Sequence, residues 1–217
     1  MKHRSERKAV ADLYQDLGRR GLIQGSSGNV SLRTQDGMVI TPSGGSPEGV
    51  RARDMAITTL DGDAWGDATP SSEWPMHAAI YQNAPDATCI IHTHADACTA
   101  LASLGEPLPA FHYMVLQFGG MTVPCAPYVT FGTPELAAHA AEAIRGHSAC
   151  LLANHGMIVH GRDAGQALER ALLLESLCRQ YLMARAAGVP RLLSEEEMLA
   201  ARERFRTYGP RPVQEPD

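Results

Sequence analysis

The sequence predicts a single α/β domain with a central mixed or antiparallel β-sheet flanked by helical layers. Short apolar runs with the alternation typical of strands occur in both halves of the chain, and stretches with the period of helices lie between them. The 217 residues contain no repeat, low-complexity segment or linker, and this length fits one large domain better than two. We expect the domain to cover residues 1–209, followed by a C-terminal tail at residues 210–217.

The first half of the chain alternates between helix and strand signals. Apolar residues three or four positions apart in residues 10–17 predict an amphipathic helix. Two alternating runs on either side of Asp36-Gly37 predict a β-hairpin, because Asp-Gly is typical of tight hairpin turns. Residues 55–66 indicate further strand and turn, and residues 74–83 predict a helix with a proline in its first turn.

The second half continues the same alternation. The expected strands are residues 87–91, residues 121–128, and one or two strands in residues 149–161 that are broken at residues 154–156. The expected helices are residues 96–104, 134–145 and 163–187. The last of these helices is apolar on more than one side, which indicates burial on more than one side, in the core or against another subunit.

Composition and charge exclude several classes of function. The net charge is −5 and no long basic run occurs, so a nucleic-acid partner is not expected. The N-terminus is charged where a signal peptide needs an apolar core, and no stretch reaches transmembrane length, so we expect a cytoplasmic protein without a membrane partner. The five cysteines form no CxxC pair and are expected to be reduced core residues, which leaves histidine and carboxylate as metal ligands.

Three histidines follow apolar runs at the ends of expected strands. His92 and His94 point to the same side of an extended segment, where they can bind one ion or simply occupy the polar end of a strand. His155 ends another apolar run, and Gly156 allows the backbone to turn sharply there. Three converging neutral imidazoles are the ligand set of a catalytic zinc site, with a fourth position for water, substrate or a carboxylate.

Three small polar segments, residues 25–29, 41–45 and 69–74, are rich in glycine and serine. Each alone is typical of a turn, whereas together they indicate anion-binding loops, and the third stands at a helix N-terminus. Because no GxxxxGK[ST] motif occurs, a small phosphorylated metabolite fits better than a nucleoside triphosphate. Glu73 follows the serines of the third loop and is either a first-turn helix residue or part of the site. His77, four residues later, is expected to support a ligand rather than to be one.

The ordered motifs GSSGNVS, TPSG, PSSEW, HTHAD, HYM, VPCAPYVTFGT and ANHG resemble the class II aldolase/adducin family, and within it the branch that cleaves L-fuculose 1-phosphate. The similarity runs from about residue 8 to residue 209. The resemblance implies a zinc-dependent aldolase, a carbon–carbon lyase of carbohydrate metabolism. Such an enzyme reversibly cleaves a ketose 1-phosphate to dihydroxyacetone phosphate and an aldehyde. The ketose would be L-fuculose 1-phosphate or a 5-deoxy- or 5-methylthioribulose 1-phosphate.

The resemblance also implies the metal ligands. His92, His94 and His155 would bind one Zn²⁺ per subunit. Glu73 would be the fourth ligand at rest and the acid/base once substrate displaces it. Zinc on the substrate oxygens would stabilise the negative charge left when the C3–C4 bond breaks, and Glu73 would return a proton to C3.

The remaining site residues follow from the same motifs. The phosphate would be held by Ser26, Gly28, Asn29, Ser43, Gly44, Ser71 and Ser72. Tyr113 would handle the proton on the C4 oxygen. Tyr113, Phe131 and Tyr208 would reach the site from a neighbouring subunit of a C4 homotetramer, so that the active sites lie at subunit interfaces.

Other functions stay open at this point. The bulky stretch VLQF, residues 115–118, favours an aldehyde with an apolar tail. A sugar-phosphate 4-epimerase, dehydratase or decarboxylase of the same family is an alternative reaction, and product analysis separates them. A non-enzymatic binding module like the adducin head domain is the alternative from another class, and the metal histidines argue against it.

Overall fold

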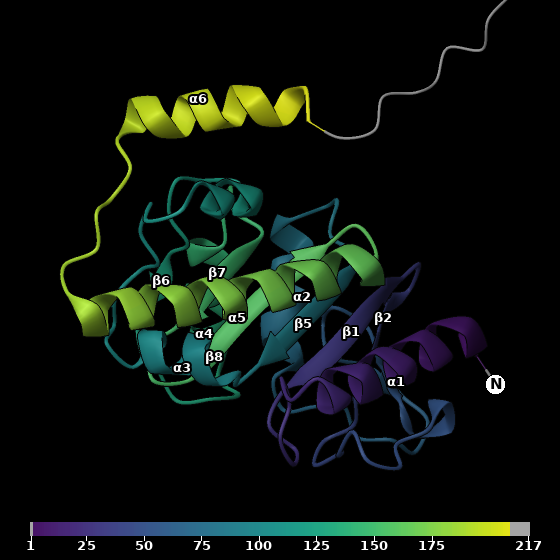
Figure 1. Ribbon diagram of the computed structural model, residues 1–217. Helices are drawn as coiled ribbons and strands as arrows, with labels where there is room; N and C mark the ends of the chain where they lie inside the picture. The colour runs from purple at the N-terminus through teal and green to yellow at the C-terminus, as the bar shows by residue number, and fades with distance from the viewer. Residues whose placement is uncertain (1, 209–217) are drawn as a thin grey trace, which may run out of the picture.

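The computed structural model describes residues 2–208 and contains one eight-stranded sheet with helices on both faces (Figure 1). The strands are β1 (Asn29–Thr34), β2 (Gly37–Ile40), β3 (Ala56–Thr58), β4 (Ala64–Trp65), β5 (Cys89–Thr93), β6 (Cys125–Ala126), β7 (Ala149–Leu152) and β8 (Gly156–Gly161). The α-helices are α1 (Arg4–Arg19), α2 (Trp74–Asn83), α3 (Asp96–Ala102), α4 (Pro134–Ala143), α5 (Ala164–Ala187) and α6 (Glu195–Arg206). Two short 3₁₀ helices are η1 (Ala52–Asp54) and η2 (Tyr113–Phe118).

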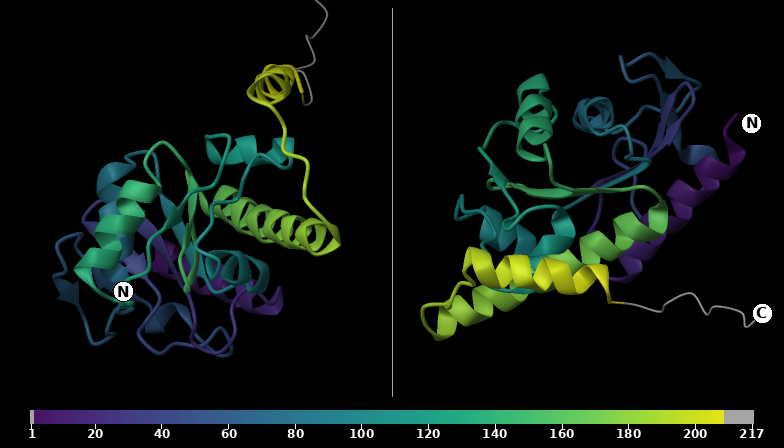
Figure 2. Two further views of the ribbon diagram at one scale, coloured as in Figure 1. Left: turned by 90° about the vertical axis from the view of Figure 1, so that its left-hand side faces the viewer. Right: turned by 90° about the horizontal axis from the view of Figure 1, so that it is seen from above.

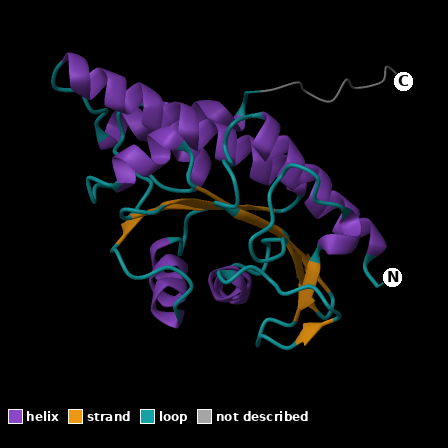
Figure 3. Ribbon diagram, turned by 90° about the horizontal axis from the view of Figure 1, so that it is seen from below, coloured by secondary structure: helices purple, strands orange, loops and turns teal. Residues whose placement is uncertain are grey.

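The sheet is mixed, as the sequence predicts. Its strand order is β4-β3-β2-β1-β5-β8-β7-β6, and every pair is antiparallel except β6 with β7. Helices α1, α3 and α5 cover one face of the sheet, and α2 and α4 cover the other (Figure 3). Each face has its own apolar core, so the sheet is buried between two helical layers and the predicted fold class is confirmed.

The helix and strand predictions are largely confirmed. The helix at residues 74–83 has the expected bounds, and the helix expected at residues 163–187 begins one residue later, after Asp163 accepts a hydrogen bond from the backbone N–H of Gln166. The strand expected at residues 121–128 is wrong in length, because only Cys125 and Ala126 pair with β7. Prolines stand on both sides of this pair and have no N–H to donate to a ladder.

Helix α6 was not among the sequence predictions. It begins with a capping box in which the Ser194 hydroxyl accepts from the backbone N–H of Glu197 and the Glu197 carboxylate accepts from that of Ser194. Figure 2 shows α6 standing apart from the two layers, joined to α5 by an extended segment and lying over η2. The tail expected at residues 210–217, with the end of the expected domain at residue 209, lies outside the described residues.

No helix within residues 2–208 combines the length and the apolar character needed to cross a membrane. The longest, α5, carries charged residues along its exposed side and is buried at six apolar positions. These are Ala167, Ala171, Leu174, Leu177, Cys178 and Tyr181. The cysteines of the described residues form no disulfide, in agreement with the expected reduced core residues.

Three neighbouring strands bring the candidate site residues to one end of the sheet. Asn29, the first residue of β1, is the direct partner of His92 in β5. His155 lies in the turn between β7 and β8, and β8 pairs with β5 on the other side. The antiparallel register therefore places the start of β1, the end of β5 and the β7–β8 turn side by side.

The β7–β8 turn differs from the sequence expectation in one detail. Asn154, not Gly156, has the left-handed backbone, with φ of 54°. Gly156 is required for space instead, because a Cβ there would lie 2.4 Å from the carbonyl oxygen of Thr93. The glycine thus allows the turn that carries His155 to approach the end of β5.

Candidate active site

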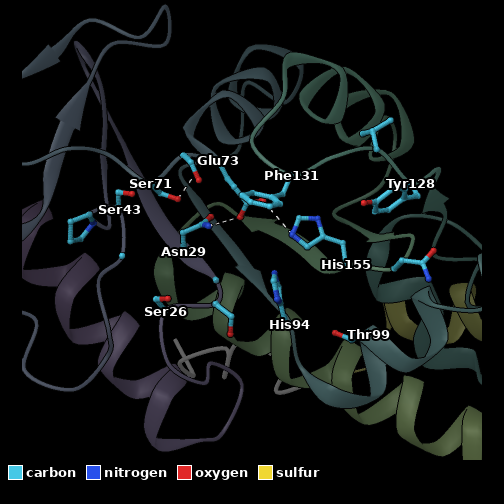
Figure 4. Close-up of a pocket in the computed structure, with 17 residues that line it drawn as sticks. Ser26, Asn29, Ser43, Ser71, Glu73, His94, Thr99, Tyr128, Phe131 and His155 are labelled. Atoms are coloured by element: carbon cyan, nitrogen blue, oxygen red, sulfur yellow. Dashed lines mark hydrogen bonds and ion pairs between the residues drawn. The ribbon is translucent and has the colours of Figure 1, made fainter.

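The three histidines singled out in the sequence form one cluster, and their potential ligand atoms all lie within 4.8 Å of one another. His92 Nε2 is 3.1 Å from His94 Nε2, and the three ring centroids are 4.7 to 5.0 Å apart. In Figure 4 the imidazoles of His94 and His155 point toward each other across the cavity floor. The structure therefore brings together residues from β5 and from the β7–β8 turn, as expected.

Glu73 closes the cluster from the first residue before α2. Its Oε2 lies 3.2 Å from His92 Nε2, and its Oε1 lies 3.2 Å from His155 Nε2. Burial alone raises the pKa of Glu73, but the imidazoles of His92 and His155 outweigh burial and hold that pKa well below its usual range. The carboxylate is therefore ionised and faces the imidazole nitrogens.

These four side chains fit a divalent metal ion. The Nδ1 of His92 lies 2.9 Å from the carbonyl oxygen of Met157, which fixes the proton on Nδ1 and leaves the Nε2 lone pair facing the cluster. Glu73 Oε1 is buried and accepts no hydrogen bond. Three imidazole nitrogens and one carboxylate oxygen that converge on one point are a donor set that suits Zn²⁺.

A cavity of about 590 Å³ opens above the cluster. All seven residues expected to hold phosphate line it, and they come from three separate loops. They are Ser26, Gly28, Asn29, Ser43, Gly44, Ser71 and Ser72. In Figure 4 Ser26, Ser43 and Ser71 lie on one side of the cavity, next to Asn29 and Glu73.

Backbone contacts hold these loops in place. Ser43 N–H donates to the carbonyl oxygen of Thr69 at 2.9 Å, and Ser71 N–H donates to that of Thr41 at 3.0 Å. A Cβ at Gly28 would lie 2.8 Å from the carbonyl oxygen of His92, so the first loop packs directly on β5. The loops therefore form one rigid wall of small residues at the N-terminus of α2, where an anion is favoured.

The opposite side of the cavity carries polar groups that the sequence did not single out. Thr99 and Tyr128 lie there in Figure 4, beyond the histidines as seen from the serine loops. Thr99 Oγ is buried and has no hydrogen-bond partner within the described part of the chain. A buried hydroxyl without a partner costs free energy, and this oxygen has no exposed surface at the cavity, so a ligand reaches it only if the Thr99 side chain rotates.

The three aromatic residues expected from a neighbouring subunit occupy two places. Phe131 lines the cavity of its own chain, so a neighbouring subunit is not needed to bring it there. Tyr113 and Tyr208 line a different cavity of about 990 Å³ between η2 and α6, away from the metal cluster. Their exposed fractions are 47% and 77%, so both side chains are accessible to a second copy of the chain.

The stretch VLQF does not line the cavity above the histidine cluster of its own chain. Val115 and Phe118 are fully buried in the core beneath α5, and Leu116 packs against the same core. Gln117 faces the cavity that contains Tyr113. The expectation that this stretch selects an apolar aldehyde is therefore wrong for the cavity of the same chain, because the 3₁₀ turn directs its two largest buried side chains inward.

His77 lies beside the cluster and is not part of it, as expected. Its Nε2 is 2.5 Å from Asn29 Oδ1, and Asn29 Nδ2 donates to Glu73 Oε2 at 2.8 Å. Burial lowers the pKa of His77 to about 3, so its ring is neutral. The sequence indicated Asn29 as a phosphate ligand but not its hydrogen bond to Glu73, because that contact depends on how α2 packs on β1.

Comparison with known proteins agrees with this geometry. The model of the class II aldolase and adducin N-terminal domain matches residues 8–182. The 5-methylthioribulose-1-phosphate/5-deoxyribulose-1-phosphate aldolase of Rhodospirillum rubrum is 42% identical over 94% of this chain and 92% of its own length. The L-fuculose phosphate aldolase of Escherichia coli K12 is 42% identical over 93% of this chain and 94% of its own length.

Solved structures lead to the same family. A structure of L-fuculose 1-phosphate aldolase superposes with a TM-score of 0.88 at 36% sequence identity, over 93% of this chain and 96% of that chain. The shared fold covers the sheet that carries the histidines, and the family model extends from α1 to α5. Fold, motif order and sequence identity together show that the chain belongs to the class II aldolase and adducin family.

Proposed function

We propose that this protein is a zinc-dependent aldolase that reversibly cleaves a ketose 1-phosphate to dihydroxyacetone phosphate and an aldehyde. One observation carries the proposal: Glu73 and three imidazoles converge on the floor of a cavity whose wall is built from glycine- and serine-rich loops. Carbon–carbon cleavage next to a carbonyl needs an electron sink, which a Lewis acid can provide, and a group that carries the proton. A phosphate group needs hydrogen-bond donors on small residues that leave room for it. The cavity offers ligands for a metal ion, a carboxylate and loops of small polar residues, and these features support the proposal. We also expect the protein to act in the cytoplasm.

Each group of cavity residues has its own role in the proposed reaction. The loop serines and glycines bind the phosphate and orient the ketose, so that its C2 and C3 oxygens lie over the histidine cluster. His92, His94 and His155 would hold a zinc ion there, which would supply the Lewis acidity that stabilises negative charge on these oxygens as the C3–C4 bond breaks. In the synthesis direction the ionised Glu73 takes a proton from C3 of dihydroxyacetone phosphate, and in the cleavage direction Glu73, once protonated from solvent, gives this proton back to C3.

Two sets of relatives suggest two kinds of candidate ketose. Proteins named for 5-methylthioribulose or 5-deoxyribulose 1-phosphate and for L-fuculose phosphate are equally similar to this chain. Their aldehyde fragments differ at the carbon next to the aldehyde, where the fucose-derived fragment has a hydroxyl group.

The proton on the C4 oxygen is assigned to Tyr113 of a neighbouring subunit in a homotetramer. Within one chain Tyr113 and Tyr208 lie beside each other, exposed and away from the metal cluster. Helix α6, which ends just before Tyr208, stands apart from the layers and exposes Leu199. The exposed apolar and aromatic side chains on α6 and just after it support insertion of this segment into a second copy of the chain.

The rival reactions share parts of this site. A 4-epimerase, dehydratase or decarboxylase would also use a metal and a phosphate loop, and product identity separates these reactions from cleavage. An adducin-like binding module would need neither the histidine cluster nor the ionised Glu73. The convergence of four buried or half-buried ligand groups on one point therefore supports an enzyme.

The test is a product assay on purified protein with a measured zinc content. L-Fuculose 1-phosphate and 5-(methylthio)ribulose 1-phosphate are offered separately, and dihydroxyacetone phosphate is detected by reduction with NADH and glycerol-3-phosphate dehydrogenase. We expect release of dihydroxyacetone phosphate that stops with a chelator and returns with zinc. Conversion of either substrate without dihydroxyacetone phosphate would replace the aldolase proposal by one of the rival reactions.

A further inference from the structure

A chain of buried polar side chains runs from the middle of the sheet to the cavity. The Tyr81 hydroxyl lies 2.8 Å from Ser31 Oγ, and Ser31 Oγ lies 2.7 Å from His77 Nδ1. His77 Nε2 then lies 2.5 Å from Asn29 Oδ1, and Asn29 Nδ2 lies 2.8 Å from Glu73 Oε2. Tyr81, Ser31 and His77 are fully buried, and only Asn29 and Glu73 line the cavity.

From Ser31 to Glu73, the donors in this chain all face the same direction. The ionised Glu73 carboxylate only accepts, so the NH₂ group of Asn29 must face it and the Asn29 carbonyl oxygen must face His77. His77 Nε2 therefore carries the ring proton. A neutral imidazole has a single N–H, so His77 Nδ1 accepts from the Ser31 hydroxyl. The single proton of the Tyr81 hydroxyl can go to Ser31 Oγ or to the carbonyl oxygens of Ser31 and Thr88. Successive hydrogen bonds polarise and so strengthen one another, and the last bond of this series is the one from Asn29 to Glu73.

Packing alone does not account for these polar residues. Ser31 pairs with Ile40 on one side and with Ile90 on the other, and both isoleucines are fully buried. Apolar side chains at this place would cost no desolvation of polar groups, so a polar chain is expensive unless every member is satisfied. Ser31, His77 and Asn29 each have hydrogen-bond partners, whereas Glu73 Oε1 has none within the described residues, and Glu73 is the member that faces the histidine cluster.

We propose that His77 is a positioning residue that holds the Asn29 carbonyl oxygen and thereby keeps the Asn29 NH₂ group on the Glu73 carboxylate. The inference deepens the proposed function, because it rests on Glu73 as the group that exchanges a proton with C3. Without the His77 donor, the Asn29 amide can rotate and turn its carbonyl oxygen toward the carboxylate, which repels it. Glu73 then loses the position from which it reaches the substrate. The second N–H of Asn29 is left for a ligand in the cavity.

The first test compares a variant that removes the donor with one that restores it. His77→Phe fills the space without an N–H. We expect kcat to fall roughly ten-fold or more, because the Asn29 amide then loses its hydrogen bond to the charged Glu73 carboxylate. His77→Gln offers an amide N–H to Asn29 and should recover most of this loss, with KM changed little in both. Equal kcat losses in the two variants would overturn the proposal.

A double-mutant cycle separates positioning from general destabilisation. If His77 acts through Asn29, then His77→Phe added to Asn29→Ala should lower kcat no further, within about two-fold, because the link is already cut. Independent losses that multiply would contradict the proposal. If His77→Phe does not fold, Ser31→Ala replaces it in the same double-mutant cycle with Asn29→Ala. Ser148→Ala is its control, since Ser148 is also buried, lies at the start of β7 and has no hydrogen-bond partner for its hydroxyl within the described residues.

A measurement without turnover distinguishes this inference from the proposed function. Long-range ¹H–¹⁵N correlation spectra of the wild-type protein report which His77 nitrogen carries the proton. We expect a neutral ring protonated at Nε2, and a proton on Nδ1 or a charged ring would overturn the inference. If the wild type cleaves no ketose 1-phosphate, the proposed function fails, whereas the His77 tautomer is still read from the spectra.

Discussion

Glu73 Oε1 lies 3.2 Å from His155 Nε2, and this buried oxygen accepts no hydrogen bond. A carboxylate oxygen and an imidazole nitrogen so placed are either joined by a proton or by a cation between them. Because His92 and His94 present their Nε2 atoms to the same point, a divalent cation satisfies all four groups at once.

Removal of any one imidazole should release the metal. His92→Ala, His94→Ala and His155→Ala are each expected to strip zinc and abolish turnover while the fold persists, since three imidazoles are the minimal set for a catalytic site. Metal analysis after dialysis and circular dichroism measure the two effects. His139→Ala on the exposed face of α4 is the control, and its zinc content should stay at the wild-type level. Full zinc and full activity in any cluster variant would remove that histidine from the ligand set.

Replacement of the Glu73 carboxylate should stop proton transfer while zinc stays bound. Glu73→Gln keeps the shape of the side chain and removes the base, so kcat should fall by roughly 10²- to 10⁴-fold, the usual range for a general acid–base group. Wild-type protein should exchange a C3-derived proton of dihydroxyacetone phosphate with D₂O in the absence of aldehyde, and NMR should show no such exchange for the variant. Exchange at the wild-type rate would assign the proton to another group.

The cavity serines should act on substrate affinity. Ser43 and Ser72 are exposed, line the cavity and donate no side-chain hydrogen bond within the described residues, so Ser43→Ala and Ser72→Ala remove only a donor to the ligand. We expect KM for a phosphorylated ketose, and the inhibition constant of inorganic phosphate, to rise in each variant. Ser5→Ala on α1 is the control with unchanged values. If neither constant moves, the phosphate binds elsewhere.

Two inactive chains should complement each other if the site is shared between subunits. Tyr113→Phe removes a proton donor and should lower kcat with little effect on zinc or oligomeric state. Mixed assemblies of Tyr113→Phe and Glu73→Gln chains contain some sites with both native residues, so part of the activity should return. Native mass spectrometry confirms that mixed assemblies form. Their complete inactivity would mean that each chain builds its own site.

Gly156 should tolerate no side chain. A Cβ there would meet the Thr93 carbonyl oxygen at 2.4 Å, so Gly156→Ala must move the β7–β8 turn or the end of β5. We expect a loss of about 1–3 kcal/mol in the free energy of unfolding, the usual cost of overpacking, together with weaker zinc binding. Gly188→Ala at the end of α5 meets nothing within 4 Å and is the matched control. Equal stability of the two variants would show that the turn is adaptable.

The sequence was informative where a function depends on a short local pattern. The helix at residues 74–83, the strand before His92 and the glycine- and serine-rich loops all follow from periodicity and turn residues within a few positions. The convergence of His155 on His92 also follows, because two strand ends with the same chemistry suggest one site. These features cover the cavity floor and its phosphate-facing wall.

Features set by tertiary contacts could not be predicted in this way. The contact between Asn29 and Glu73 depends on how α2 lies on β1, and Thr99 becomes part of the cavity only through the turn between β5 and α3. The left-handed backbone of Asn154 has no signal beyond the tolerance of asparagine for that conformation. The inward direction of Val115 and Phe118 follows from a 3₁₀ turn that the apolar stretch alone does not specify.

The candidate ligands come from three segments, the start of α2, the end of β5 and the β7–β8 turn, so the unfolded chain holds no assembled site. Metal binding is therefore coupled to folding by mass action, and it adds about 1.4 kcal/mol of stability for every ten-fold excess of free metal over the dissociation constant. Heat resistance then depends on the metal supply of the surroundings. A low concentration of free metal ion would therefore lower the amount of folded protein as well as its activity.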